Sequence, residues 1–309
     1  MENKNTPAHK SGFVTVVGRP NVGKSTLVNA FLQQKVAAVS PRPQTTRRRQ
    51  LGILTLEQAQ IIFVDTPGLH KPIHKLGEYM NQVAADTIGD ADVVVWMVDA
   101  AQPPNDEDRL VAERIAAARG RGTVILALNK VDQLNQETLQ ERRAAYLALL
   151  PEAEPFALSA STGLNRQELL ERIVTLLPEG PVFYDEDQIT DLYEREIAAD
   201  LIRQSALVHL REEVPHSIAV RVDEYKERGE TGAFIRATVY VERESHKGIV
   251  IGKGGEMLKK IGAAARKEIE EMSGRKVFLE LNVKVNKNWR DNADALRQFG
   301  YFEEKEDDH

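Results

Sequence analysis

The sequence contains no cysteine among its 309 residues. This absence excludes a disulfide framework and any metal site built on thiolates, and it suits a reducing compartment. The first ten residues are polar and lack the apolar centre of a signal peptide. The most apolar stretch, residues 93–98, is far too short to cross a bilayer. We therefore expect a cytoplasmic protein, and peripheral attachment to the inner membrane stays open.

The chain also lacks an overall excess of positive charge, since its net charge is −6. Taken alone, this value argues against nucleic acid as a partner. The charge is unevenly distributed, however. Residues 243–290 hold 12 Lys and Arg against 6 Asp and Glu, whereas residues 291–309 hold 2 against 7. The chain therefore has a basic block followed by an acidic tail.

The first 180 residues alternate short apolar runs with amphipathic ones, which is typical of an α/β domain with a mostly parallel sheet. We expect strands at 13–17, 51–56, 61–65, 93–98, 123–129 and 154–158. We expect helices at 24–32, 76–88, 106–118, 136–149 and 166–176. In such a sheet, ligands bind at the carboxyl ends of the strands.

Two prolines and a glycine at 178–181 interrupt this alternation and indicate a linker. After it we expect a helix at 191–211, strands at 217–226 and 234–243, a Gly-rich turn, a helix at 256–272, a strand at 276–285 and a short helix at 291–299. The length and the 42% hydrophobic content fit two domains. We predict a first domain at 1–180, a linker at 181–190, a second domain at 191–300 and an acidic tail at 301–309.

Residues 18–25 form the phosphate-loop pattern G-x-x-x-x-G-K-S between an apolar run and an amphipathic helix. In such a loop, backbone N–H groups surround a phosphate at the positive end of the helix. Lys24 would neutralise the β- and γ-phosphates, and Ser25 would ligate Mg²⁺. A chance Gly-rich turn is the alternative, which the flanking strand and helix disfavour. The residues expected to contact the nucleotide here are Gly18, Arg19, Pro20, Asn21, Val22, Gly23, Lys24, Ser25 and Thr26.

Three further motifs, each at a predicted strand end, indicate that the base is guanine. In the D-T-P-G motif, Asp65 would hold Mg²⁺ through a water and Gly68 would sense the γ-phosphate. In the N-K-x-D motif, Asp132 would accept hydrogen bonds from two guanine donors that adenine does not present. Each motif alone could be a solvated turn, but their order after a phosphate loop predicts a GTP site. The residues involved are Asp65, Thr66, Pro67, Gly68, Asn129, Lys130, Asp132, Ser159 and Ala160.

A second Gly-rich loop, residues 252–255, lies between apolar segments and precedes a basic helix. Its G-x-x-G pattern is typical of a KH domain, whose loop clamps the backbone of single-stranded RNA. A second phosphate loop is disfavoured because no Lys-Ser or Lys-Thr pair follows Gly255, and a purely structural turn remains the alternative. The residues predicted to contact RNA are Ile251, Gly252, Lys253, Gly254, Gly255, Lys259, Lys260 and Arg266.

The motifs at 18–25, 65–68, 129–132 and 159–160 resemble those of translation-factor-like GTPases. With the sequences GRPNVGKSTL, PQTTRRR and DTPGLH, the chain resembles, over nearly its whole length, the Era family of bacterial GTPases of small ribosomal subunit assembly. The resemblance implies an α/β P-loop GTPase domain with a mostly parallel sheet, followed by an α+β type II KH domain. It implies GTP or GDP and Mg²⁺ as ligands. It also implies the 3′ end of 16S rRNA and the 30S subunit as partners of a mostly monomeric protein.

The resemblance also bears on hydrolysis. Thr46, or its neighbour Thr45, would ligate Mg²⁺ and sense the γ-phosphate. Ras-like GTPases carry Gln directly after Asp-x-x-Gly to orient the attacking water, and this chain has Leu69 there. We therefore predict slow intrinsic hydrolysis, on the order of 10⁻⁴ to 10⁻² s⁻¹, with Lys24, Thr46 and Gly68 nearest the chemistry. GTPases with a similar loop bind K⁺ beside the phosphates, so a further hypothesis makes Asn21 a K⁺ ligand.

Together these features predict a GTPase switch that couples its nucleotide state to RNA binding during 30S subunit maturation. Two alternatives stay open. One is a membrane-associated signalling or cell-cycle GTPase, and the other is an RNA-binding protein for which GTP is only a structural ligand. A P-loop kinase is disfavoured by the N-K-x-D motif.

Overall fold

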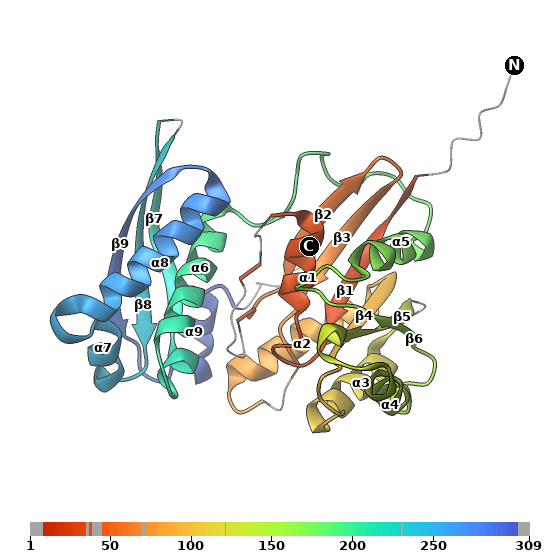
Figure 1. The fold of residues 1–309 in the computed structure, drawn as a ribbon. Coiled ribbons are helices and arrows are strands. Elements are labelled where there is room, and N and C mark those ends of the chain that lie inside the picture. Colours follow the sequence, from red (N-terminus) through yellow and green to blue (C-terminus); the bar gives the residue numbers. More distant parts are fainter. Residues whose placement is uncertain are drawn as a thin grey trace, which may run out of the picture. The chain divides into compact units, whose positions relative to one another are not determined.

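The computed structural model describes residues 9–34, 37–38, 45–69, 72–120, 122–229 and 231–301. These residues divide into two compact units (Figure 1). The first unit holds the described residues up to 37, 48–69 and 81–191. The second holds 38, 45–47, 72–80 and 192–301. Residues 41–44, which precede Thr45 and Thr46, and residues 302–309 of the predicted acidic tail lie outside the described residues.

A six-stranded sheet forms the first unit, in the order β2-β3-β1-β4-β5-β6. Its strands are β1 (Lys10–Val17), β2 (Gln50–Leu56), β3 (Ala59–Asp65), β4 (Val93–Asp99), β5 (Thr123–Asn129) and β6 (Glu154–Ala157). Strand β2 pairs antiparallel with β3, and all other neighbours are parallel. The predicted mostly parallel sheet is confirmed.

Helices cover both faces of this sheet because its central strands are apolar on both sides. In β4, which is buried throughout, Val95 packs with α1 and α5, whereas Val94 and Trp96 pack with α2, α3 and α4. The helices are α1 (Lys24–Leu32), α2 (Lys75–Gly89), α3 (Asp106–Ala118), α4 (Gln136–Leu147) and α5 (Arg166–Leu176). This layering places the loops after β1, β3, β5 and β6 at one edge of the sheet, where the predicted nucleotide motifs lie.

The predicted bounds of α1, α3, α5 and β5 are confirmed. The largest difference on the first unit is at β1, which begins three residues earlier than predicted. Lys10 and Ser11 are polar, yet they extend the strand because they pair with Ala59 and Gln60 of β3. Helix α4 ends two residues earlier than predicted, where the chain turns and the Leu149 N–H donates to the Tyr146 carbonyl (3.0 Å).

The predicted linker, 181–190, is hydrogen-bonded to the first unit in this structure. The backbone N–H groups of Phe183 and Tyr184 donate to the Gln60 side-chain carbonyl (2.7 and 3.0 Å). Farther along, the Ile53 N–H donates to the Ile189 carbonyl (2.9 Å). The segment therefore belongs to the first unit up to residue 191, along the β2–β3 side of its sheet.

The second unit is built on a three-stranded sheet of β7 (Ala219–Arg228), β8 (Gly232–Val241) and β9 (Lys276–Val285). Strand β8 is antiparallel to β7 and parallel to β9. Two long helices, α6 (Glu194–His209) and α8 (Glu256–Ser273), pack on one face. Alternation along β8 directs Ile235, Ala237 and Val239 into this core, as expected for a sheet with one helix-covered face.

Two short helices complete the second unit. Helix α9 (Ala293–Gln298) lies in an aromatic cluster with Tyr240, Trp289 and Phe299. Helix α7 (Glu244–Ile251) comes directly before the predicted Gly-rich turn, in a stretch for which the sequence analysis gave no element bounds. Residues 244–251 contain a glycine and three β-branched residues, which disfavour a helix locally. Burial of Val250 in the core of the unit overrides that preference.

Candidate functional site

The phosphate loop joins β1 to α1, whose first-turn N–H groups have no side-chain cap because Gly23 occupies the cap position. Such a helix start is suited to binding an anion. Lys24 is buried, and its Nζ donates to the carbonyls of Gly18 (3.1 Å) and Arg19 (3.0 Å). Burial lowers the pKa of Lys24 to about 8, against the opposing effect of the Asp65 carboxylate. A phosphate at the loop would favour the charged form of this lysine and raise its pKa.

Two oxygen donors meet at the start of α1 and the end of β3. The Ser25 hydroxyl donates to the Asp65 Oδ2 at 2.7 Å, and Asp65 is fully buried. Hydroxyl and carboxylate oxygens are ligands that Mg²⁺ prefers. Among the described residues no group of three or more His, Cys, Asp or Glu could hold a metal. A magnesium ion here would therefore be held by Ser25 and Asp65 together with phosphate oxygens of the nucleotide, as in P-loop sites.

The D-T-P-G motif continues from β3 past the phosphate loop. The Thr66 hydroxyl donates to the Val16 carbonyl (2.9 Å), which fixes the start of the motif against β1. A Cβ at Gly68 would lie 2.8 Å from the Pro20 nitrogen, so only glycine allows this close approach. Leu69 is 1% exposed and packs in the core with α2 and β4. A side chain buried there cannot orient an attacking water.

Asn129 connects the two loops that would contact the base and the phosphates. Its Nδ2 donates to the Val22 carbonyl (2.7 Å), and its Oδ1 accepts from the Ala160 N–H (2.8 Å). All three groups are buried, so each hydrogen bond replaces one to water. Asp132 follows in an exposed turn, where its carboxylate is accessible to a ligand. The structure thus brings the N-K-x-D motif, the phosphate loop and the Ser159–Ala160 loop together.

Two acidic residues in this region were missed by the sequence analysis. Asp99, at the end of β4, accepts from Lys130 Nζ (2.6 Å), which fixes the lysine of the N-K-x-D motif. Asp108 lies 3.3 Å from Arg19 Nε and also accepts from the Asn105 N–H (3.1 Å). Burial raises the pKa of Asp108. The N-x-x-D spacing at 105–108 is the signal that could have identified Asp108 as a capping residue, since both residues cap α3.

Thr46 lies in the second unit, whereas Ser25 and Asp65 lie in the first. Its neighbours hold it there. The Arg47 guanidinium is 2% exposed and donates to the carbonyls of Ile218 (2.8 Å) and His216 (3.1 Å). The Thr45 carbonyl accepts from Arg203. Of the three proposed Mg²⁺ ligands, the structure brings two together within one unit.

The G-x-x-G loop connects α7 to α8. Gly252, Gly254 and Gly255 all have positive φ (73°, 61° and 82°), which favours glycine and gives a tight turn between the helices. Lys253 at its tip is exposed. The other predicted RNA contacts, Lys259, Lys260 and Arg266, are exposed on α8, whose opposite face is buried through Ile261, Ala265 and Ile269. Ile251, half-buried, ends α7.

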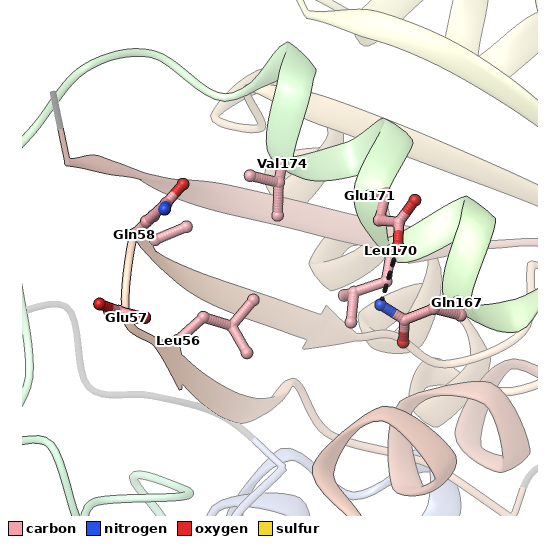
Figure 2. A pocket seen from close by; sticks show the side chains of 8 residues that line it. Leu56, Glu57, Gln58, Gln167, Leu170, Glu171 and Val174 are labelled. Carbon is pink, nitrogen blue, oxygen red and sulfur yellow. Dashed lines mark hydrogen bonds between the residues drawn. The ribbon is translucent and has the colours of Figure 1, made fainter. Parts of the chain in front are cut away.

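A separate hollow of about 310 Å³ lies between the β2–β3 turn and α5 (Figure 2). Its apolar lining includes Leu56, Leu170 and Val174, and the Gln167 amide donates to Glu171 beside it (3.2 Å). None of the predicted site residues lines this hollow. The nucleotide motifs therefore do not depend on it.

Comparison with known proteins agrees with this geometry. A model of the 50S ribosome-binding GTPase family matches residues 13–130, and a KH-domain model matches residues 213–290. The chain is 48% identical over 299 residues to GTPase Era of Caldanaerobacter subterraneus subsp. tengcongensis, covering 96% of this chain and 100% of that relative. The chain belongs to the Era family of GTPases. GTPase Era of Halothermothrix orenii is 45% identical over 299 residues, covering 95% and 99% of the two chains.

Two solved Era structures have the same fold over nearly the whole chain. Era bound to MgGDPNP and nucleotides 1506–1542 of 16S ribosomal RNA superposes with a TM-score of 0.90 at 40% identity, covering 95% of this chain and 99% of that one. A point variant of Aquifex aeolicus Era bound to GDP and AlF₄⁻ gives 0.89 at 40% identity, covering 94% and 99%. The predicted P-loop GTPase fold followed by a KH domain is therefore confirmed for this member of the Era family.

Proposed function

We propose that this Era-family GTPase binds GTP with Mg²⁺, hydrolyses it slowly, and couples its nucleotide state to binding of the 3′ end of 16S rRNA during 30S subunit maturation. The nucleotide part of this proposal is supported above all by the two hydrogen bonds of the Asn129 side chain, which join the phosphate loop to the Ser159–Ala160 loop. The RNA half is supported by the 40% identical Era structure that holds a 16S rRNA segment.

In this proposal the loop from Gly18 to Thr26 surrounds the phosphates, and Lys24 neutralises their charge. Ser25, Asp65 and Thr46 hold Mg²⁺, which supplies electrostatic stabilisation of the phosphoryl group. Asp132 selects guanine, and Asn129 and Lys130 fix its loop. Because the apolar Leu69 side chain is buried, the attacking water would be oriented by backbone groups such as the Gly68 N–H. That leaves hydrolysis slow.

Asn21 is the proposed K⁺ ligand. It has a positive φ of 64° in the phosphate loop, where its side chain would lie beside the phosphates. A bound cation there would stabilise charge that develops on the transferring phosphoryl group. Hydrolysis should therefore be faster in potassium than in sodium buffer, and an N21A variant should lose the difference.

The KH domain would clamp single-stranded RNA at Gly252–Gly255, with Lys259, Lys260 and Arg266 contacting phosphates. Because these side chains are exposed, each lost contact should reduce the slope of log affinity against log salt by about 0.7.

Among the described residues, no helix has the length and apolarity needed to span a membrane. We place the protein in the cytoplasm, and sedimentation with lipid vesicles tests the membrane alternative.

The experiment for this function measures RNA affinity and GTP hydrolysis in one preparation. Labelled RNA corresponding to nucleotides 1506–1542 of 16S rRNA is titrated with protein loaded with a GTP analogue, GDP or no nucleotide. The proposal expects affinity to depend on the nucleotide and a K253E variant to bind weakly in every state. Competition by ATP as effective as that by GTP would refute the nucleotide assignment.

A further inference from the structure

The β-sheet of the second unit has an outer face that its two long helices do not cover. Alternation along β8 directs Phe234, Arg236 and Tyr240 away from the core formed with α6 and α8. The pairing register places Phe234 between Lys226 of β7 and Phe278 of β9, and Arg236 between Glu224 and Glu280. The outer face therefore has rows of aromatic and charged side chains.

The described residues that cover this outer face lie at one end of it. Tyr240 packs with Trp289 and Phe299, in the cluster that includes α9. Toward the β7–β8 turn, Phe278 is 63% exposed, although its ring stacks on Phe234 with centroids 5.8 Å apart and planes inclined by 16°. The exposed, stacked ring of Phe278 therefore presents a flat apolar surface to solvent.

Cationic side chains lie close to this pair of stacked rings. The Arg228 guanidinium lies 5.0 Å from the Phe234 ring centre, and that of Arg236 lies 5.4 Å from it. Arg236 is paired with Glu224 (2.9 Å) and Glu280 (3.2 Å). Arg228 and Lys276, both exposed, form no ion pair with any of the described residues. The positive charges of Arg228 and Lys276 are thus available to an anionic partner.

We propose that Arg228, Phe234, Lys276 and Phe278, here called the Phe278 platform, form a second single-stranded RNA contact of the KH domain. An unpaired base would stack on Phe278, and Arg228 and Lys276 would contact the flanking phosphates. Stacking on aromatic side chains combined with nearby cations is how proteins hold single strands without reading their sequence. This inference rests on the proposed function, because it assumes that the chain binds RNA.

RNA fits this surface better than an anionic membrane does. The neighbours of Phe278 on this sheet face are Phe234, Lys276 and Glu280, none of them an aliphatic residue, whereas membrane insertion buries a continuous apolar face. A single strand needs only one stacking surface and a few phosphate contacts, and the platform provides both.

The platform and the G-x-x-G loop lie toward opposite ends of the KH domain. Helix α8 starts at the G-x-x-G loop and ends three residues before Lys276. Its 18 residues correspond to a length of about 27 Å. In Figure 1, α7 lies at the end of the sheet away from the β7–β8 turn. A strand clamped over about four nucleotides at the loop does not reach the platform, so only a longer RNA contacts both.

The test compares two RNA lengths with matched variants. The probes are the whole segment corresponding to nucleotides 1506–1542 of 16S rRNA, and its shortest fragment that the wild-type protein binds, about four nucleotides. We expect F278A to weaken binding of the long RNA by about 5- to 100-fold and to leave the short RNA unchanged. F278W should retain long-RNA affinity, whereas F278L should lose it, because only the aromatic ring stacks on a base. V208A, at a half-exposed apolar position on α6, is the matched control.

Each outcome supports or overturns the inference. If K253E weakens binding of both RNAs but F278A and a double R228A/K276A variant bind the long RNA like wild type, the platform is not an RNA contact, while the proposed function stands. If the wild type binds neither RNA, the proposed function itself fails. If F278A lowers sedimentation with phosphatidylglycerol vesicles and leaves RNA affinity unchanged, the platform is a membrane contact and the inference is overturned. Thermal unfolding of each variant checks that the fold is intact.

Discussion

The two units differ in how they hold the charges at their predicted sites. In the first, Lys24, Asp65 and Asn129 are buried, and each makes hydrogen bonds to fixed groups. In the second, Lys253 and the basic residues of α8 are exposed. A small ligand of fixed shape is recognised by a preorganised network, whereas a flexible strand can be held by several mobile charges. Removal of one of these charges should therefore have a larger effect in the first unit than in the second.

Guanine recognition offers the strongest test of that contrast. In D132N the carboxylate that would accept two guanine donors becomes an amide, which presents its own donor to them. GTP affinity should fall by about 10⁴-fold, and xanthosine triphosphate should become the preferred ligand. Competitive displacement of a fluorescent nucleotide measures both affinities. Unchanged preference for GTP would remove Asp132 from the base site.

Loss of the buried Asn129 side chain should have the second-largest effect on nucleotide affinity. In N129A the Val22 carbonyl and the Ala160 N–H lose their buried partner, each at a cost of about 1–3 kcal/mol. Nucleotide affinity should fall by about 10²-fold, because both loops that it joins are proposed to contact the nucleotide. N135A is the control, since Asn135 caps α4 in an exposed turn. Equal nucleotide affinities of the two variants would contradict the bridging role.

Arg47 differs from the exposed charges of the second unit, because its guanidinium is buried. R47A should lower the unfolding free energy by about 1–3 kcal/mol, since the Ile218 and His216 carbonyls lose their donors. The ring of Trp289 lies 5.6 Å from the guanidinium. Its fluorescence, recorded in a W96F background that removes the other tryptophan, reports the transition of this unit. R221A, at a partly exposed ion pair, should cost far less.

Lys24 predicts a pH dependence of the nucleotide-free protein. Its pKa is about 8 in the folded state, below the ordinary 10.5 of the unfolded chain, so the unfolded state binds more protons between these values. The destabilisation from burying the charge is complete below pH 8 and is relieved as the pH rises. Relative to K24M, the unfolding free energy should rise by up to about 1.4 kcal/mol per pH unit from pH 8 to 10.5. Denaturant titrations across that range measure it, and a flat difference would show that Lys24 is not buried as described.

The sequence predicted those parts of the protein that depend on local spacing. The phosphate loop, the strand-end motifs and the bounds of α1, α3 and α5 follow from short-range patterns that a single chain displays. Asp99 and Asp108 were missed because their partners, Lys130 and Arg19, are distant in sequence and only the folded sheet brings them close. Helix α7 was missed because tertiary burial of Val250 outweighs its poor helix propensity.

The location of Thr45–Arg47 could not be predicted either. The sequence shows a polar, arginine-rich loop, which ordinarily is solvated. In the structure the Arg47 and Arg203 side chains are buried and satisfied by backbone carbonyls of the second unit. Such a pairing has no sequence signature, because any residue supplies a carbonyl. These hydrogen bonds hold Thr45 and Arg47 in the second unit. Thr46, the proposed γ-phosphate sensor, lies between them in the sequence.

The most direct measurement of the central proposal is RNA affinity in three nucleotide states for the wild type, T46A and T45A. Labelled RNA matching nucleotides 1506–1542 of 16S rRNA is titrated with each protein in the presence of a GTP analogue, GDP or no nucleotide. The account predicts that wild-type affinity changes by at least about tenfold between the GTP-analogue and GDP states, or about 1.4 kcal/mol of coupling. T46A should bind the analogue yet hold RNA equally in all three states. Identical wild-type affinities in the three states would contradict the account.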